Sequence, residues 1–494
     1  MGVRVRIALG AVAAALLAPG SASAANSVYW NWATFSGSNV SGAGISFAGL
    51  SGSGGGALTT GGHPLGVAID AAAGRIYWAN YPNTSTFACT AGSGGNTISF
   101  ENLGGGSVGN VPTGSATVNG PDGVAIDPAA GRIYWANELG NKISYANLNG
   151  SGGADIVTGA ATVSCPAGVA VDPAIGKIFW ANQTANKISY ANLNGTGGGD
   201  LSTGSASVNG PYGVAIDPVA GRIYWTNTGN NTVSYAALSG LSGADLNTGL
   251  ATVNVPDGVA IDPAAGRIYW ANNGATSTAN EISYANLNGS GGADLPTPGA
   301  SAPASNSKFP ALLETPVAAT APGISGGSSA GATLSCSNGS WAPDLVESFL
   351  YRAPQSFVYA WTRNGSLISG ASSSTITATS AGSYVCYVTA VNHAGSATQP
   401  SAAHAVSGGS GGGPSASISG SKINSKKHTA KFTFTATGAS GFQCALVKKK
   451  KHKKPKPQFS SCSSPKTYKH LKKGKYIFEV RGVGGQAATK SFKI

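Results

Sequence analysis

Residues with chemical capability stand at one recurring position of this 494-residue sequence. Short proline-containing segments recur along the chain, and beside them lie His63, Asp122, Tyr212 and Asp257. An imidazole, a phenol and two carboxylates are groups that bind cations or polar ligands and that transfer protons. These four residues are the candidate ligand-binding site. The alternative, which we favour, is that they are polar turn residues in contact with water.

Signatures of catalysis are sparse. The six histidines include no HExxH motif, and no Cys or His cluster has the spacing of a zinc site. We therefore expect no resident metal and no cofactor, and we favour a binding protein over an enzyme. The alternative function is a secreted hydrolase or lyase with its site at the four polar residues.

A lysine run near the C-terminus is the second candidate site. Residues 414–494 hold 19 Lys and Arg against one acid, Glu479, whereas the rest of the chain holds 12 bases and 17 acids. A like-charged run cannot pack, so it should be an exposed loop. Ammonium groups act as point charges, and without interleaved aromatics they give no base stacking. The expected partner is an anionic cell-envelope polymer or lipid surface, not a specific nucleic acid, and a merely solubilising loop is the alternative. The lysines are Lys448, Lys449, Lys450, Lys451, Lys453, Lys454 and Lys456.

The N-terminus predicts export. Arg4 and Arg6 precede a short apolar run, and Ala22-Ser23-Ala24 supplies small residues at a cleavage site. That order is typical of a secretory signal peptide over residues 1–24. The expected location is therefore secreted, extracellular or at the cell surface.

Six cysteines in an exported chain can pair oxidatively. Their positions suggest one disulfide in each structural region, although two free thiols are the alternative for the first pair. The expected pairs are Cys89 with Cys165, Cys336 with Cys386, and Cys444 with Cys462.

An internal repeat fills most of the chain. Residues 123–155 read GVAIDPAAGRIYWANELGNKISYANLNGSGGAD, and close copies start at Gly168, Gly213 and Gly258, with a looser one at Gly66. Each unit reads as four short strands separated by Asp-Pro-x-x-Gly and Asn-Gly turns. Six aromatic pairs of the Tyr-Trp type predict six four-stranded blades, an all-β propeller over residues 25–316.

The ring also needs a closing strand, because an open sheet would expose unpaired edges. The first unit starts directly at Val28-Tyr29-Trp30, and a spare inner strand follows the sixth unit at 309–314. We expect that strand to complete the first blade. Asp122 and Asp257 are 135 residues, or three blades, apart and should then face each other across the channel entrance.

The units resemble low-density-lipoprotein-receptor class B repeats, the YWTD propellers, across roughly residues 27–316. The matching residues are the Asp after GVAI, the Gly-Arg/Lys-Ile-Tyr-Trp core and the Asn-Leu-Asn-Gly hairpin, but Tyr-Trp-Thr-Asp becomes Tyr-Trp-Ala-Asn in most units. The resemblance implies a platform that recognises an extracellular protein or glycan ligand. We expect the chain to act as a monomer.

Two further β modules follow the propeller. Residues 317–407 place Cys336, Trp361 and Cys386 at even spacing, with Tyr384 two residues before the second Cys, and resemble a bacterial immunoglobulin-like sandwich. Residues 408–413 read as a Gly/Ser linker. Residues 414–494 resemble a small disulfide-containing bacterial β-sandwich, so the predicted fold is a six-bladed propeller plus two sandwiches.

Overall fold

The computed structural model describes residues 26–36, 39–51, 55–58, 60–82, 89, 96–274, 282–296, 308–407, 415–449 and 456–494. These residues form strands and turns, with a single 3-10 turn, η1 (Val346–Ser348). The predicted signal peptide and Lys450, Lys451, Lys453 and Lys454 lie outside the described residues. Within them, no helix has the length and apolarity that a membrane span requires.

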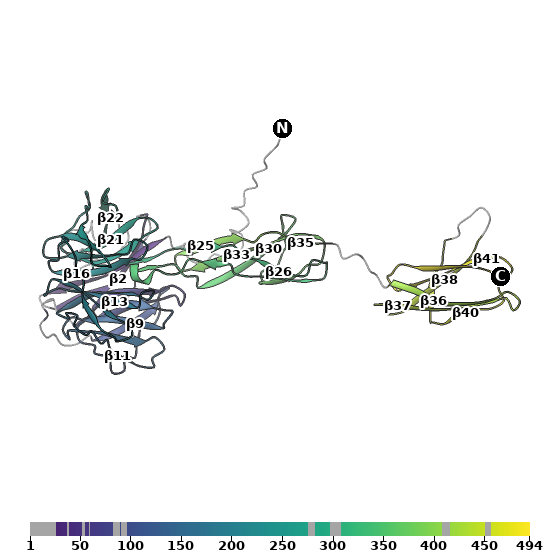
Figure 1. Ribbon diagram of the computed structural model, residues 1–494, viewed down its shortest axis with the longest axis horizontal. Helices are drawn as coiled ribbons and strands as arrows, with labels where there is room; N and C mark the ends of the chain where they lie inside the picture. The colour runs from purple at the N-terminus through teal and green to yellow at the C-terminus, as the bar shows by residue number, and fades with distance from the viewer. Residues whose placement is uncertain are drawn as a thin grey trace, which may run out of the picture.

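The described chain begins with a ring of six β-sheets, the six-bladed propeller (Figure 1). Blade one contains β1 (Ser27–Ser36), β2 (Asn39–Gly49), β3 (Gly55–Leu58) and β24 (Ala311–Leu313). Blade two contains β4 (Pro64–Asp70), β5 (Arg75–Asn80), β6 (Thr97–Asn102) and β7 (Gly109–Asn110). Blade three contains β8 (Pro121–Asp127), β9 (Arg132–Asn137), β10 (Lys142–Asn147) and β11 (Gly153–Asp155).

The remaining three blades repeat this pattern. Blade four contains β12 (Pro166–Asp172), β13 (Lys177–Asn182), β14 (Lys187–Asn192) and β15 (Gly198–Asp200). Blade five contains β16 (Pro211–Asp217), β17 (Arg222–Asn227), β18 (Thr232–Ala237) and β19 (Gly243–Asp245). Blade six contains β20 (Pro256–Asp262), β21 (Arg267–Asn272), β22 (Ile282–Asn286) and β23 (Gly292–Asp294).

The inner strands explain the GVAID motif. Every residue of β8 is buried, as expected for a strand that lines the central channel. The glycine brings neighbouring inner strands close together, because a Cβ on Gly123 would lie 2.7 Å from the Cα of Gly168. The aspartate ends the strand, since Asp127 Oδ1 accepts a hydrogen bond of 3.0 Å from the Ala130 amide. The inner-strand aspartates are therefore turn caps.

The Asn of the Tyr-Trp-Ala-Asn motif holds each blade together. In blade three, Asn137 Oδ1 accepts from the Trp135 indole at 3.2 Å, and Asn137 Nδ2 donates to Ser144 Oγ at 2.9 Å. Ser144 donates onward to Asp155 at 2.7 Å, and that carboxylate also accepts from the Thr117 amide. An amide can accept and donate at once, which a carboxylate in its place cannot do. The Asn therefore has a structural role of its own.

The predicted closing strand is present. β24 pairs with β1 in antiparallel register, with Ala311 opposite Tyr29. The chain beyond it extends the same sheet, because β29 (Leu350–Tyr351) pairs with β24 in parallel. Blade one is thus shared between the propeller and the segment that follows it.

Residues 317–407, the middle module, form the next β unit. Its Cys336–Cys386 disulfide and fully buried Trp361 lie in one hydrophobic cluster, and the Tyr384 hydroxyl donates to the Ser380 carbonyl at 2.8 Å. These are the features predicted from the Cys-Trp-Tyr-Cys pattern. The strands are β25 (Ala318–Thr320), β26 (Ile324–Gly326), β27 (Thr333–Cys336), β28 (Ser340–Trp341), β30 (Ser356–Arg363), β31 (Ser366–Leu367), β32 (Thr375–Thr377), β33 (Gly382–Asn392), β34 (Gly395–Pro400) and β35 (His404–Val406).

The basic module, described at residues 415–449 and 456–494, forms two small sheets around an aromatic core. Phe432 and Phe478 stack with their ring centroids 4.1 Å apart, and the Cys444–Cys462 disulfide lies beside them. One sheet contains β36 (Ser415–Asn424), β37 (Thr429–Thr437) and β40 (Lys466–Tyr468). The other contains β38 (Phe442–Lys448), β39 (Ser460–Cys462), β41 (Lys475–Gly482) and β42 (Ala488–Lys493).

Candidate functional site

The predicted polar residues lie at the upper mouth, which we define as the end of the channel where the inner strands begin. Ala311 stands opposite Tyr29 as Ala68 stands opposite Tyr77 in blade two, so the blades can be aligned by register. In each blade, one residue stands three positions before this alanine. These six residues form a ring around the mouth, and each is at most 2% exposed. The ring is Lys308, Leu65, Asp122, Ala167, Tyr212 and Asp257.

Lys308 connects the polar members of this ring. Its Nζ lies 3.3 Å from Asp257 Oδ2 and donates to the Tyr212 hydroxyl at 2.6 Å. The Tyr212 hydroxyl donates in turn to Asp122 Oδ2 at 2.6 Å. Asp122 and Asp257, which were expected to face each other, are thus linked through a tyrosine and a lysine. The cation at the mouth is the chain's own ammonium group.

Burial dominates the electrostatics of this network. Burial raises the pKa of Asp257 to about 6, although Lys308 opposes the shift. Burial also raises the pKa of Asp122, again against the Lys308 charge, and raises that of Tyr212 well above its usual range. Because water does not reach these carboxyl groups, the Lys308 charge is the main influence that favours their ionised forms.

Two further residues complete the upper mouth. Glu138, which follows the recurring Asn in blade three, is fully buried, and burial next to Asp122 raises its pKa to about 7. His63 packs edge-on against Phe35 with ring centroids 5.6 Å apart, and burial lowers its pKa to about 4. Among the residues that the structure describes, the mouth therefore holds three carboxyl groups, one ammonium and a histidine that is neutral at pH 7.

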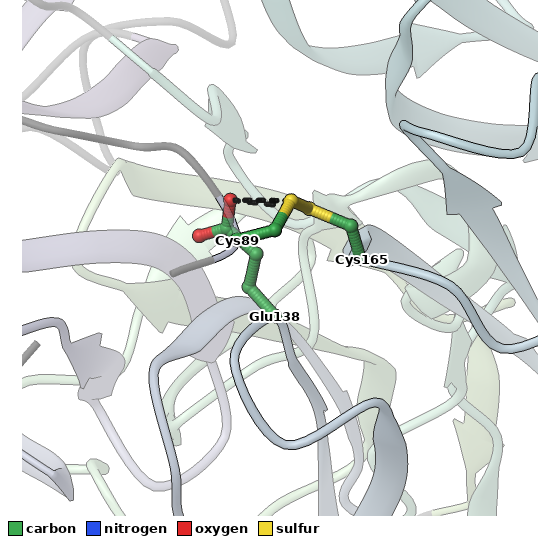
Figure 2. Close-up of side chains that lie close together, drawn as sticks. All are labelled: Cys89, Glu138 and Cys165. Carbon is green, nitrogen blue, oxygen red and sulfur yellow. Dashed lines mark hydrogen bonds between the residues drawn. A yellow bond between two sulfur atoms is a disulfide. The ribbon is translucent and has the colours of Figure 1, made fainter. Parts of the chain in front are cut away.

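A disulfide lies directly above Glu138. Cys89 and Cys165 are joined, as the sequence predicts, and Cys165 Sγ lies 3.4 Å from Glu138 Oε1 (Figure 2). Gln183 Oε1 approaches the same sulfur at 3.4 Å. The two sulfurs and the carboxylate are near enough to share a metal ion, yet the disulfide leaves neither sulfur as the thiolate that metals require. In this oxidised form the group is a covalent cross-link over the mouth.

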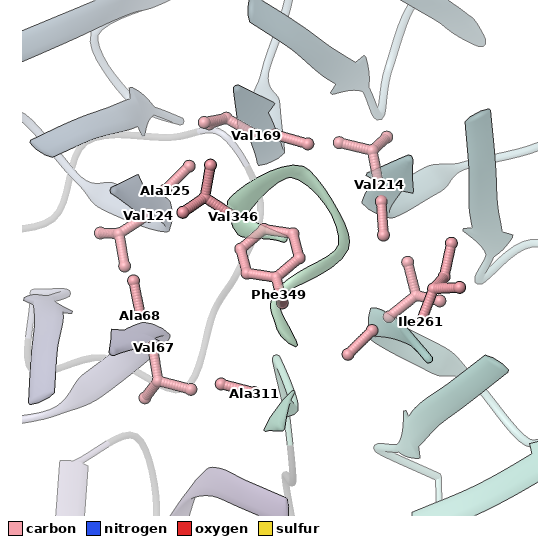
Figure 3. Packing of buried hydrophobic residues seen from close by; sticks show 14 of the residues in the cluster. Val67, Ala68, Val124, Ala125, Val169, Val214, Ile261, Ala311, Val346 and Phe349 are labelled. Carbon is pink, nitrogen blue, oxygen red and sulfur yellow. The ribbon is translucent and has the colours of Figure 1, made fainter. Parts of the chain in front are cut away.

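The lower mouth is filled by the middle module. Val346 and Phe349, from η1 and its C-cap, project into the channel between the inner strands of the blades (Figure 3). Ser348 Oγ donates to the Ile216 carbonyl at 2.5 Å, and the Phe349 carbonyl accepts from the Leu312 amide. Phe349 is 4% exposed. The segment is an apolar plug that closes the end of the channel opposite Lys308.

The four sequence-predicted mouth residues are thus brought together, but they are not the solvated turn residues that we favoured. Each is at most 2% exposed, and the segment that leads into β24 places Lys308 in the same ring. Phe309 packs against Tyr212 with ring centroids 5.6 Å apart. Lys308 was not predicted from the sequence, although it immediately precedes the predicted strand at 309–314. Glu138, which stands directly after the Asn of a motif that is repeated for structural reasons, was not predicted either.

The lysine run is described only at its ends. Lys448, Lys449 and Lys456 are exposed, as a solvated run requires. Lys448 ends β38, and its ammonium lies 5.7 Å from the centre of the Tyr476 ring.

Similarity to solved structures is limited to fold. No family model and no curated protein matches the chain. The structure of a nidogen/laminin complex is 16% identical, covers 58% of this chain and 98% of its own, and has a TM-score of 0.42. A putative 6-phosphogluconolactonase from Bacteroides fragilis is 12% identical, covers 60% of this chain and 100% of its own, and has a TM-score of 0.38. A protein from Lactobacillus plantarum is 12% identical, with coverages of 58% and 99% and a TM-score of 0.39.

Proposed function

We propose that this chain is an extracellular binding protein that acts as a monomer. The propeller is its recognition platform for a protein or glycan ligand, and the basic module attaches it to an anionic cell-envelope polymer or lipid surface. Three disulfides are typical of an oxidising compartment. They are consistent with the secreted location that the N-terminus predicts.

The observation that carries this proposal is the filled channel. Substrates of propeller enzymes need access to polar groups in the channel mouth, but Asp122, Tyr212 and Asp257 are at most 2% exposed, with Lys308 in the same ring bonded to Tyr212, and Phe349 closes the other end of the channel. The polar side chains satisfy one another instead. This arrangement favours recognition by outer surfaces of the blades over catalysis inside the ring.

Retention on purified cell envelope tests the attachment. The full chain is compared with a variant in which Lys448–Lys456 is replaced by Gly/Ser of equal length, across a series of salt concentrations. We expect salt-sensitive retention that the variant loses, because charges at a surface are screened over about 10 Å at 0.1 M salt. Equal retention of both forms at every salt concentration would count against attachment through these lysines.

One observation favours the alternative function of a hydrolase or lyase. Glu138 and Asp257 have pKa values raised to about 7 and about 6, which suits a general acid or base near neutral pH. The test is turnover of a panel of lactones and esters by the full chain, with Glu138→Gln as the matched variant. Turnover that this substitution abolishes would establish the enzyme, and none in the panel would support the binding protein.

A further inference from the structure

The basic module gathers its lysines at one end of its sandwich. The β36–β37 turn, the β38 end, the loop from β40 to β41 and the β42 end all meet there. Hydrogen bonds tie these segments together, from the Leu471 amide to the His428 carbonyl at 3.0 Å and from the Lys449 amide to the Lys475 carbonyl at 2.8 Å. We name this end the lysine pole. Its exposed lysines are Lys426, Lys427, Lys448, Lys449, Lys469, Lys472, Lys473, Lys475 and Lys493.

The opposite end of the module has the contrary composition. It is formed by the segments 437–441, 462–465 and 482–488, all of them described, and these contain no lysine or arginine. The single acid of the module, Glu479, lies within β41 opposite Thr489, away from both ends. The module is therefore polarised, and its charge is not spread evenly over its surface as a purely solubilising role would allow.

The fold places like charges directly against each other near this pole. Lys475 pairs with Lys493 across β41 and β42, and Lys422 pairs with Lys431 across β36 and β37. Like charges at directly opposite strand positions destabilise a sheet. The module contains two such pairs, and no acid lies opposite either lysine pair, so both pairs lower the stability of the sheets in the absence of a bound anion. A bound anion would relieve this repulsion.

We propose that the lysine pole binds a linear polyol phosphate, a polymer of phosphodiester groups that carries no bases, with segments far apart in the sequence contributing charges to one site. This inference rests on the proposed surface attachment and assigns its ligand. Lysine is a phosphate ligand that acts as a point charge, whereas the planar guanidinium that recognises carboxylates bidentately is absent from the pole. Tyr476 is buried and Tyr468 half-buried, so the pole offers neither base stacking nor an aromatic anchor for a lipid interface.

Relocation of charge in the full chain tests the proposal. The first variant is Lys426→Gln/Lys427→Gln, and the second adds Ser440→Lys and Gln486→Lys at the opposite end, which restores the net charge. Both added positions are exposed. The probe is immobilised synthetic poly(glycerol phosphate), with binding measured across a salt series. Because each contacting lysine adds about one to the slope of log affinity against log salt, both variants should lose a slope of about two and about tenfold in affinity.

The outcomes separate the pole from its alternatives. Recovery of wild-type affinity in the relocated variant would show that net charge alone matters and would overturn the proposal. Tighter binding to phosphatidylglycerol vesicles, or to single-stranded DNA at matched phosphate concentration, would overturn the assigned ligand class.

The envelope experiment distinguishes the two levels of the proposal. If the loop replacement abolishes envelope retention while Lys426→Gln/Lys427→Gln leaves it and poly(glycerol phosphate) binding unchanged, surface attachment stands and the pole fails. If both pole variants lose affinity for poly(glycerol phosphate) while no form of the chain is retained on the envelope, the proposed ligand site stands and surface attachment fails.

Discussion

The substitution Lys308→Met tests whether the upper mouth is a charge-compensated network. Lys308 is 1% exposed and is the cation beside Asp257 at 3.3 Å. Removal of one partner from a buried ion pair typically costs about 3–5 kcal/mol in free energy of unfolding, because the remaining charge is left uncompensated. We expect a loss of this size at pH 7.5.

The pH dependence of that loss follows from the Asp257 pKa of about 6. At pH 7.5 the wild-type carboxylate is about 1.5 units above its pKa, so its ionised form is favoured by about 2 kcal/mol. At pH 5 Asp257 is mainly protonated already, and this part of the contribution of Lys308 is absent. The destabilisation by Lys308→Met should therefore shrink by about 2 kcal/mol between pH 7.5 and pH 5.

Native-state hydrogen exchange of peptides from β16 and β20 measures this loss where it occurs, which matters because a three-part chain does not unfold in one step. Lys142→Met is the matched control, since Lys142 pairs with Asp155 at 2.7 Å but is 52% exposed. That surface pair should contribute about 0–1 kcal/mol at both pH values. Equal losses for the two variants at pH 7.5, or a Lys308→Met loss independent of pH, would refute the charge-compensation reasoning.

Three further substitutions test other parts of the structure. Phe349→Ala should cost about 3–5 kcal/mol and release the middle module from the channel, seen as a larger radius of gyration in solution scattering, whereas Leu367→Ala, at 48% exposure, should leave the radius unchanged. Val255→Gly should raise the melting temperature of the propeller. Val255 has a φ of 48° at the position where blade five has Gly210, with a φ of 58°, and relief of this left-handed backbone strain is worth about 1–2 kcal/mol. The opposite substitution, Gly210→Val, should lower the melting temperature. Burial raises the pKa of Glu138 from 4.5 to about 7, so its contribution to stability is complete below about pH 4.5 and lost as the pH rises through 7. Glu138→Gln should flatten this part of a pH–stability curve measured by native-state hydrogen exchange of peptides from β9, and an unchanged curve would contradict the assignment.

Repetition made the propeller predictable from the sequence. The aromatic pairs recur in six units and the Asp-Pro-x-x-Gly turns in four of them, and the last three intervals are each 45 residues, so an interpretation of one blade can be extended to the others. The closing strand could be found because the first unit lacks an inner strand and a spare one stands after the sixth. The same reasoning placed His63, Asp122, Tyr212 and Asp257 at one mouth, since a position within a repeat fixes a height along the channel.

Burial and contacts between modules could not be predicted in this way. The polarity of Asp122 and Asp257 indicated side chains in contact with solvent. The sequence pattern gives no sign that Lys308, from a different blade, supplies the compensating charge. The apolar plug could not be predicted from the sequence either, because Phe349 belongs to a loop of another module and is not part of a repeated motif. Similarly, the lysine run predicted a binding site in one loop only. The pairing of β37 with β40 also brings Lys426 and Lys473 to the same end of the sandwich, which the sequence did not indicate.

The sharing of blade one between two modules determines how the molecule carries mechanical load. β24 lies between β1, the first described strand, and β29, which the middle module contributes. A pull on an anchored C-terminus reaches the ring at the residues after β24. There the parallel β24–β29 bonds and the seated Phe349 side chain resist it together. If the proposed attachment through the basic module is correct, tension would be borne within blade one, and the other five blades would stay free to present the proposed ligand-binding surface.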